Sequence, residues 1–307
     1  MKDGKSFEVF VKNLLMCYGF FEVESDGIYI YNGSPGQMIN GFGEAHNADV
    51  LLEPPVQIPF SYSTRLLIEC KDYNHKVGLD IVRSVLALKQ DINNFNILTD
   101  DDLKVRKSNI RSNVYSEMNR YVYQVVLAST NGFTMPAQKF AVAYRIPLIS
   151  FDKMPFWSDF VELCRVYRTA DDFEEKIIQF AKDVGKKTAL AVTNFGQLLI
   201  LQLQNASGVD FDSSSTYSLH WQSDNKEIWE LRLGDNLYKF QLPSEIMKKW
   251  ISDSQDDLRI RKTAINCKEN DLSNMIVYYQ KDNKPQIKMI SIDRSALEHA
   301  KQLLGDE

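Results

Sequence analysis

RLLIECK, at residues 65–71, is a short apolar run that ends in an acid, a thiol and a base. Because side chains alternate between the two faces of a β-strand, Glu69 and Lys71 would share one face and Cys70 would lie on the other. Both charged residues come at the C-terminal end of the predicted strand, where an α/β sheet usually opens onto its ligand crevice. We therefore expect a hydrolytic site at this end of the strand.

A second carboxylate lies upstream, in the run NADVLL at residues 47–52. Two prolines stop this run, and the residues that follow have the length and composition of a hairpin connection, so Asp49 and Glu69 would meet across adjacent strands. Two carboxylates suit Mg²⁺, and a nearby lysine can orient a water or stabilise charge on a phosphate. The alternative is a surface ion pair, because E-x-K is common on strands and exposed pairs mean little.

Asp49, Glu69 and Lys71 resemble the D…E-x-K signature of the PD-(D/E)xK nuclease superfamily, with Asn47-Ala48 in place of the usual Pro or Gly before the Asp. Two other stretches strengthen the resemblance. GKSFE, at residues 4–8, opens an amphipathic helix, and VVLASTNGFT, at residues 125–134, precedes a run of small and apolar residues. In order and content these stretches are similar to the Mrr-like restriction endonuclease domain, over roughly the first 150 residues.

The resemblance implies a Mg²⁺-dependent DNA endonuclease of the restriction or defence type, which hydrolyses phosphodiester bonds. Asp49 and Glu69 would hold the Mg²⁺ with help from the Cys70 carbonyl or the backbone on the Ile68 side, and Mn²⁺ is an expected substitute. Lys71 would position the attacking water. Glu8 would complete the metal site directly or through water; its alternative is a solvent-facing helix glutamate. The rival function is a catalytically inactive nuclease-fold subunit that serves DNA binding or complex assembly.

The resemblance also implies an α/β fold with a restriction-endonuclease-like three-layer core around a central mixed sheet. Helical spacing at residues 79–90, a strand at 122–129, a helix at 135–143 and a strand at 146–150 agree with such crossovers. Residues 20–31 are expected to form one strand, whereas residues 39–48, rich in Gly and Asn, are expected to be irregular. His46 within the irregular stretch either approaches the cleft or is incidental.

A boundary is expected near residues 184–187, which divides the chain into a nuclease domain at 1–183 and a second domain at 184–307. Beyond the boundary the pattern changes to short alternating strands with hairpin turns, followed by helices. This pattern predicts a C-terminal antiparallel α+β domain. Its role is left open between target recognition and oligomerisation.

The net charge of −5 argues against a general polyanion binder, because non-specific affinity for nucleic acid comes mainly from neutralising phosphates. Any DNA contact must therefore be local. The best candidate is the basic segment at residues 103–120, and its alternative is a solvated loop. Its expected DNA-binding residues are Lys104, Arg106, Lys107 and Arg111.

With 307 residues, of which 44% are hydrophobic, the chain is long enough for about two globular domains. No apolar run approaches a membrane span and the N-terminus does not resemble a signal peptide, so we expect a cytoplasmic protein with no membrane partner. The four cysteines have neither zinc-site nor disulfide-framework spacing. Cutting both DNA strands requires two active sites, so a homo-oligomer, dimer or higher, is expected.

Overall fold

The computed structural model describes most of the chain, and several stretches lie outside the description. The described ranges are residues 3–34, 36–57, 62–96, 121–205, 208–221, 227–245 and 257–305. The predicted DNA-binding residues Lys104, Arg106, Lys107 and Arg111 lie outside them. Within these ranges every helix is too short or too polar to reach across a lipid bilayer.

A mixed five-stranded sheet forms the centre of the N-terminal part, with strand order β1-β5-β6-β7-β8. Strand β5 pairs with β6 antiparallel, whereas β6–β7 and β7–β8 are parallel. Leu67 and Ile68, which point to opposite faces of β6, are both fully buried, as expected when both faces of a sheet are covered. The strand bounds are β1 (Phe21–Glu22), β5 (Val50–Glu53), β6 (Ser63–Lys71), β7 (Tyr121–Ser129) and β8 (Leu148–Ser150).

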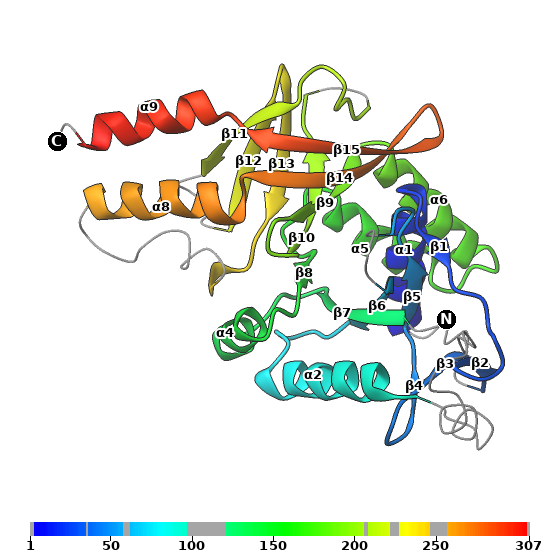
Figure 1. Ribbon diagram of the computed structural model, residues 1–307. Helices are drawn as coiled ribbons and strands as arrows, with labels where there is room; N and C mark the ends of the chain where they lie inside the picture. The colour runs from blue at the N-terminus through cyan, green and yellow to red at the C-terminus, as the bar shows by residue number, and fades with distance from the viewer. Residues whose placement is uncertain are drawn as a thin grey trace, which may run out of the picture.

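Helices cover both faces of the central sheet (Figure 1). Helices α2 (Leu79–Asn94) and α4 (Met135–Ala143) follow β6 and β7 and pack on the face that carries Leu67. Helices α1 (Asp3–Cys17), α5 (Trp157–Tyr167) and α6 (Phe173–Gly185) pack on the face that carries Ile68. The expected mixed sheet with helical crossovers is therefore present.

A small antiparallel sheet precedes β5 and differs from the expectation for this stretch. It contains β2 (Ile30–Gly33), β3 (Gly36–Asn40) and β4 (Ala45–Asn47). The expected long strand at residues 20–31 is wrong because the Asp26 carboxylate accepts the backbone N–H groups of residues 28, 29 and 30, which turns the chain. The expected irregular stretch at 39–48 is also wrong, since half of it pairs in β3 and β4.

The C-terminal part contains a closed seven-stranded barrel, in the order β10-β13-β12-β11-β15-β14-β9. Most neighbours are antiparallel hairpin partners, as expected. The fully antiparallel prediction is wrong at one position, because β11 and β15 pair in parallel and complete the ring. The bounds are β9 (Thr188–Thr193), β10 (Leu198–Leu203), β11 (Thr216–Trp221), β12 (Ile228–Leu233), β13 (Asn236–Gln241), β14 (Asn274–Lys281) and β15 (Lys284–Ile292).

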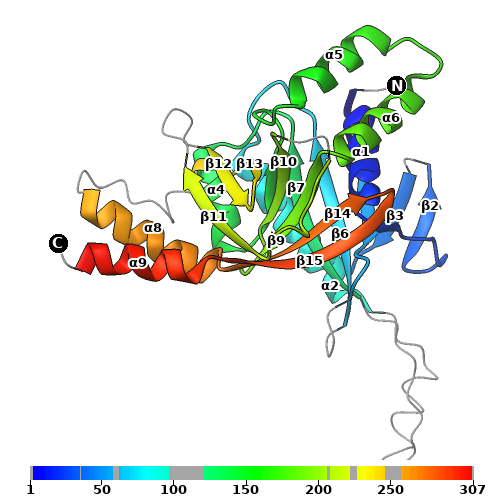
Figure 2. The same cartoon turned by 90° about the horizontal axis from the view of Figure 1, so that it is seen from above.

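Two further helices, α8 (Asp257–Asp271) and α9 (Arg294–Gly305), extend side by side away from the barrel (Figures 1 and 2). The barrel and the central sheet themselves are in contact. Leu190 and Tyr278 of the barrel belong to the same apolar cluster as α1 and α6. Tyr18 and Thr188 also share a buried hydrogen bond of 2.5 Å between their hydroxyl oxygens. The two parts of the chain therefore share a core at the expected boundary.

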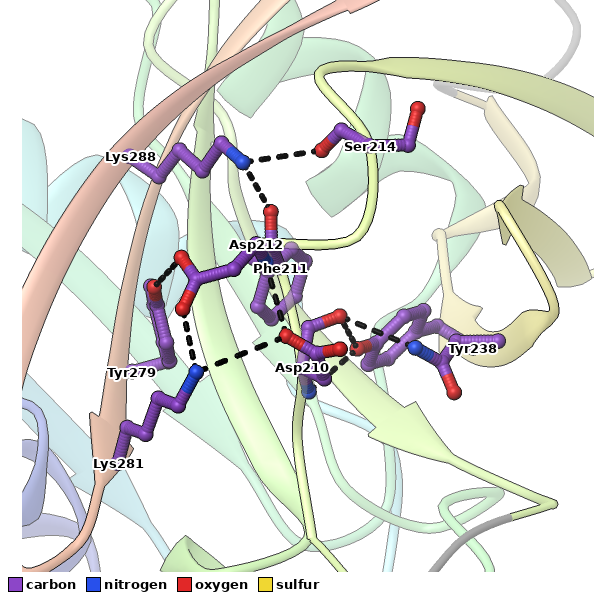
Figure 3. A network of polar contacts seen from close by, with 9 residues as sticks. Asp210, Phe211, Asp212, Ser214, Tyr238, Tyr279, Lys281 and Lys288 are labelled. Carbon is purple, nitrogen blue, oxygen red and sulfur yellow. Dashed lines mark hydrogen bonds and ion pairs between the residues drawn. The ribbon is translucent and has the colours of Figure 1, made fainter.

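The segment between β10 and β11 inserts Phe211 into the barrel core. The Phe211 ring lies 4.8 Å from that of Tyr238 and 4.9 Å from that of Tyr279. Asp212 pairs with Lys281 and accepts a hydrogen bond from the Tyr279 hydroxyl at 3.2 Å, which fixes this segment to β14 (Figure 3). Phe211 is fully buried and thus links the segment to two strands of the barrel.

Replacing Phe211 with Ala is expected to lower the free energy of unfolding by about 3–5 kcal/mol, since it removes a buried ring and leaves a cavity. Urea unfolding measures the change. Phe42→Ala is the matched control: its ring is 79% exposed, and we expect a change within about 0.5 kcal/mol. Equal destabilisation by the two substitutions would show that Phe211 does not hold the barrel.

Candidate active site

The Lys71 ammonium lies beside two carboxylates at the C-terminal end of β6. Its Nζ is 2.8 Å from Oε2 of Glu69 and 3.4 Å from Oδ2 of Asp49. The Lys71 side chain is 19% exposed, and those of Asp49 and Glu69 are each 13% exposed. This is a partly buried cluster of two acids and one base, unlike a solvated surface pair.

Asp49 reaches this cluster because of the register between β5 and β6. Val50 at the start of β5 lies opposite Ile68, so the residue before it is level with the end of β6. Oδ2 of Asp49 accepts the backbone N–H of Cys70 at 2.8 Å, which fixes the carboxylate against β6. The structure thus brings together Asp49, Glu69 and Lys71, the three residues of the motif.

Cys70 contributes its backbone to this cluster, since its side chain is buried on the opposite face with α1. Burial raises the pKa of the Cys70 thiol well above its usual value, and the nearby carboxylates raise it further. The thiol therefore stays protonated. The N–H and C=O of one strand residue point to the same side, so the Cys70 carbonyl faces the strand edge where Asp49 lies.

The charges of the cluster perturb one another. Burial raises the pKa of the Glu69 carboxyl, and repulsion by Asp49 adds to this, while Lys71 opposes both. Burial alone would lower the pKa of Lys71, but attraction to Glu69 and Asp49 outweighs it and the pKa is raised. Lys71 is consequently a permanent cation, which can donate hydrogen bonds but cannot accept a proton near neutral pH.

Glu8 lies near the cluster without joining it. Its Oε2 accepts from Nζ of Lys5 at 3.0 Å, one turn away on α1. Burial raises the pKa of the Glu8 carboxyl, and repulsion by Asp49 is a smaller cause in the same direction. Glu8 and Asp49 line a hollow of about 360 Å³, separate from the cleft that Glu69 and Lys71 line. This position fits a contribution through water better than direct contact with a shared ligand.

The cleft beside Glu69 and Lys71 has a volume of about 840 Å³. Residues from β4, the end of β6 and α2 form its walls. The lining also includes His46, whose Nε2 lies 2.7 Å from Oδ2 of Asp91. The sequence pattern left His46 undecided and gave no sign of Asp91, because the two residues are 45 positions apart and belong to no shared motif.

The oxygen donors of the cluster are of the kind that Mg²⁺ uses. Within the described residues, no group of three or more His, Cys, Asp or Glu side chains is arranged to hold a metal ion. Asp49 and Glu69 offer two carboxylates, and the Cys70 carbonyl faces the same edge. Mg²⁺ is usually bound through one or two carboxylates and keeps several waters, so two carboxylates and a carbonyl suffice.

Comparison with known proteins adds no functional assignment. No protein-family model matches the chain, and no curated protein matches it. A solved crystal structure of a protein of unknown function, AF1548, is similar at 15% sequence identity, over 59% of this chain and 79% of that one, with a TM-score of 0.35. The role of the cluster therefore depends on the geometry of its own residues.

Proposed function

We propose that this protein is a Mg²⁺-dependent DNA endonuclease of the restriction or defence type, with Asp49, Glu69 and Lys71 as its active site. One observation carries the proposal. A single ammonium contacts both carboxylates, at 2.8 and 3.4 Å, at the C-terminal end of a central strand that borders a cleft. An exposed ion pair would need neither the second carboxylate nor the cleft.

The mixed sheet supports the same function. The resemblance to PD-(D/E)xK nucleases implies a central mixed sheet between helices, with the Asp on one strand and the E-x-K on its neighbour. Here Asp49 directly precedes β5, and Glu69 and Lys71 end the adjacent antiparallel strand β6. Strand β6 also pairs in parallel with β7, and α2 follows β6 in the chain, so the mixed sheet extends beyond the two strands that carry the site. A restriction-endonuclease-like core is therefore part of the proposal.

Asp49, Glu69 and the Cys70 carbonyl would hold Mg²⁺ or Mn²⁺. When bound, the metal would lower the pKa of a coordinated water and neutralise charge that develops on the phosphate. Lys71 remains protonated, so its role is to hold the attacking water or a phosphate oxygen by hydrogen bonding. Glu8, on the far side of Asp49, would act through water. The basic residues Lys104, Arg106, Lys107 and Arg111 are the proposed contacts to the DNA backbone.

Nicking of supercoiled plasmid by the purified protein tests this function. We expect nicking in Mg²⁺ or Mn²⁺ and none when a chelator is present. The rival, an inactive nuclease-fold subunit for DNA binding or assembly, would shift DNA in a gel without cutting it. Binding without nicking in either metal would reject the endonuclease and favour that rival.

Acidification is expected to weaken Mg²⁺ binding at a higher pH than for an ordinary glutamate. Burial and repulsion by Asp49 raise the pKa of Glu69, and only the ionised carboxylate attracts the cation. The affinity should therefore rise with pH over a range that lies above the ordinary titration range of a glutamate. Lys71→Met should move this rise to higher pH, since Lys71 lowers the pKa of Glu69. Calorimetric titrations across this range measure the effect, and a pH-independent affinity would contradict it.

The proposal includes a second copy of the chain, because cutting both strands of a duplex normally requires two active sites. Light scattering of the purified protein should give a dimer or a larger oligomer. The C-terminal barrel, with α8 and α9 projecting from it, is the proposed place for association or for target recognition. A strict monomer at micromolar concentration would remove the oligomer from the proposal.

A further inference from the structure

We propose that His46 is the general base of this site and that Asp91 is its positioning residue. The inference rests on the proposed endonuclease function and names a further group for the same reaction. His46, Asp91, Glu69 and Lys71 all line the one cleft, although they come from β4, α2 and β6. The substrate in that cleft would be a phosphodiester, with its attacking water between Lys71 and His46.

Asp91 fixes which ring nitrogen of His46 is available. Oδ2 of Asp91 lies 2.7 Å from Nε2 of His46, and Oδ1 accepts the backbone N–H of Gly43 at 2.7 Å. These hydrogen bonds, with that from His46 as the larger cause, hold the pKa of Asp91 below its usual range. Because Asp91 is an anionic acceptor, Nε2 carries the hydrogen. Within the described part of the chain, Nδ1 has no hydrogen-bond partner, so its lone pair is free to accept a proton.

The loop between β3 and β4 is built around the Asp91 carboxylate. A Cβ atom on Gly41 would lie 1.9 Å from Oδ2 of Asp91, so only glycine fits at that position. The Phe42 N–H also donates to the Asp91 backbone carbonyl, at 3.1 Å. The loop therefore holds His46 in one place relative to α2. A histidine oriented by a carboxylate is a recurring way to prepare an imidazole for proton transfer.

The reaction needs a base that the D…E-x-K residues do not supply. Attraction to Glu69 and Asp49 keeps Lys71 protonated, and the two carboxylates are assigned to the metal. His46 lines the same cleft as Glu69 and Lys71, and Asp91 binds its Nε2 and leaves Nδ1 as the nitrogen that can accept a proton. Nδ1 is therefore the group in the cleft that is suited to accept the proton.

In the proposed step, water gives one proton to Nδ1 of His46 and its oxygen forms a bond to phosphorus. The bond between phosphorus and one ester oxygen breaks, and that oxygen takes a proton from solvent and leaves as an alcohol. His46 then returns its proton to solvent. One water is consumed for each phosphodiester, and the products are a phosphate monoester and a sugar hydroxyl.

The test separates catalysis from anchoring of the loop. His46→Ala should lower the single-turnover nicking rate about 100-fold or more, leave Mg²⁺ affinity unchanged, and recover part of its activity when imidazole is added. The matched control is Glu175→Ala, at an exposed position of α6, which should nick at the native rate. Nitrogen NMR of metal-free native protein should show the His46 ring protonated at Nε2. Asp91→Asn should reduce the population of that tautomer together with the nicking rate.

Three results would overturn the inference while the endonuclease function stands: native nicking by His46→Ala, a lost rate that imidazole does not restore, or a ring protonated only at Nδ1. Failure of the native protein to nick DNA in any metal would instead reject the endonuclease function itself. The NMR measurement needs neither metal nor activity, so it tests the Asp91 contact even if a variant folds poorly.

Discussion

Lys71→Met protein is expected to fold and bind DNA but to nick plasmid at less than about one-hundredth of the native rate, as when a preorganised hydrogen-bond donor is removed from an active site. Methionine keeps most of the apolar stem and removes only the ammonium. The lost hydrogen bonds are those to Glu69 and Asp49, at 2.8 and 3.4 Å. Without them, neither the water nor the phosphate is held, although both carboxylates remain.

The stability of this variant should fall by only about 1–2 kcal/mol, because the carboxylates stay close to the open cleft and can be hydrated or protonated. Lys186→Met is the matched control. Lys186 pairs with Asp183 at 2.7 Å, but both side chains are more than half exposed, at 52% and 55%, so its loss should cost about 1 kcal/mol or less and leave nicking unchanged. If both variants nick at the native rate, the Lys71 cluster is a structural ion pair.

Asp49→Asn protein is expected to lose Mg²⁺ binding and nicking together. The asparagine oxygen can still accept the Cys70 N–H that Asp49 accepts at 2.8 Å, so the contact between β5 and β6 persists. The charge that attracts the metal is lost, however, and Mg²⁺ depends on anionic oxygen ligands. Nicking should fall about 100-fold or more, since metal activation of water and neutralisation of the phosphate are both weakened.

A second variant and a control accompany this prediction. Glu69→Gln should behave like Asp49→Asn, because it removes the other carboxylate of the cluster. Asp183→Asn removes a surface carboxylate and should change neither metal binding nor nicking. Thermal unfolding would show that each variant is folded at the assay temperature. Native Mg²⁺ affinity in folded Asp49→Asn protein would mean that the metal, if any, binds elsewhere.

Local sequence patterns predicted the part of the fold that local interactions decide. Apolar runs bounded by turn residues located β6 and β7. Helical periodicity located α4 at residues 135–143, its observed bounds. The proline-rich connection after residue 53 correctly placed β5 and β6 side by side. Because that pairing fixes the register, Asp49 and Lys71 could be expected at one site from the sequence alone.

Features that depend on contacts between residues far apart in the sequence were not predicted. The barrel closes through the parallel pair β11–β15. In the described part of the chain β12, β13, α8 and β14 lie between these two strands, whereas hairpin patterns predict pairing only between strands that follow one another in sequence. The Asp26 turn replaced an expected strand because one carboxylate offered three backbone amides a better partner than a sheet would. The Asp91 carboxylate that holds the β3–β4 loop likewise acts from another element.

The central claim is that Asp49 and Glu69 form one metal site beside the Lys71 cation. Its most direct test is calorimetric titration of Mg²⁺ into native, Lys71→Met and Asp49→Asn proteins in parallel. Removing a cation next to the carboxylates strengthens the field that attracts Mg²⁺, whereas removing a carboxylate weakens it. We predict that Lys71→Met binds Mg²⁺ more tightly than the native protein and that Asp49→Asn binds it more weakly. Equal affinity in all three proteins, or no Mg²⁺ binding by any of them, would contradict the account.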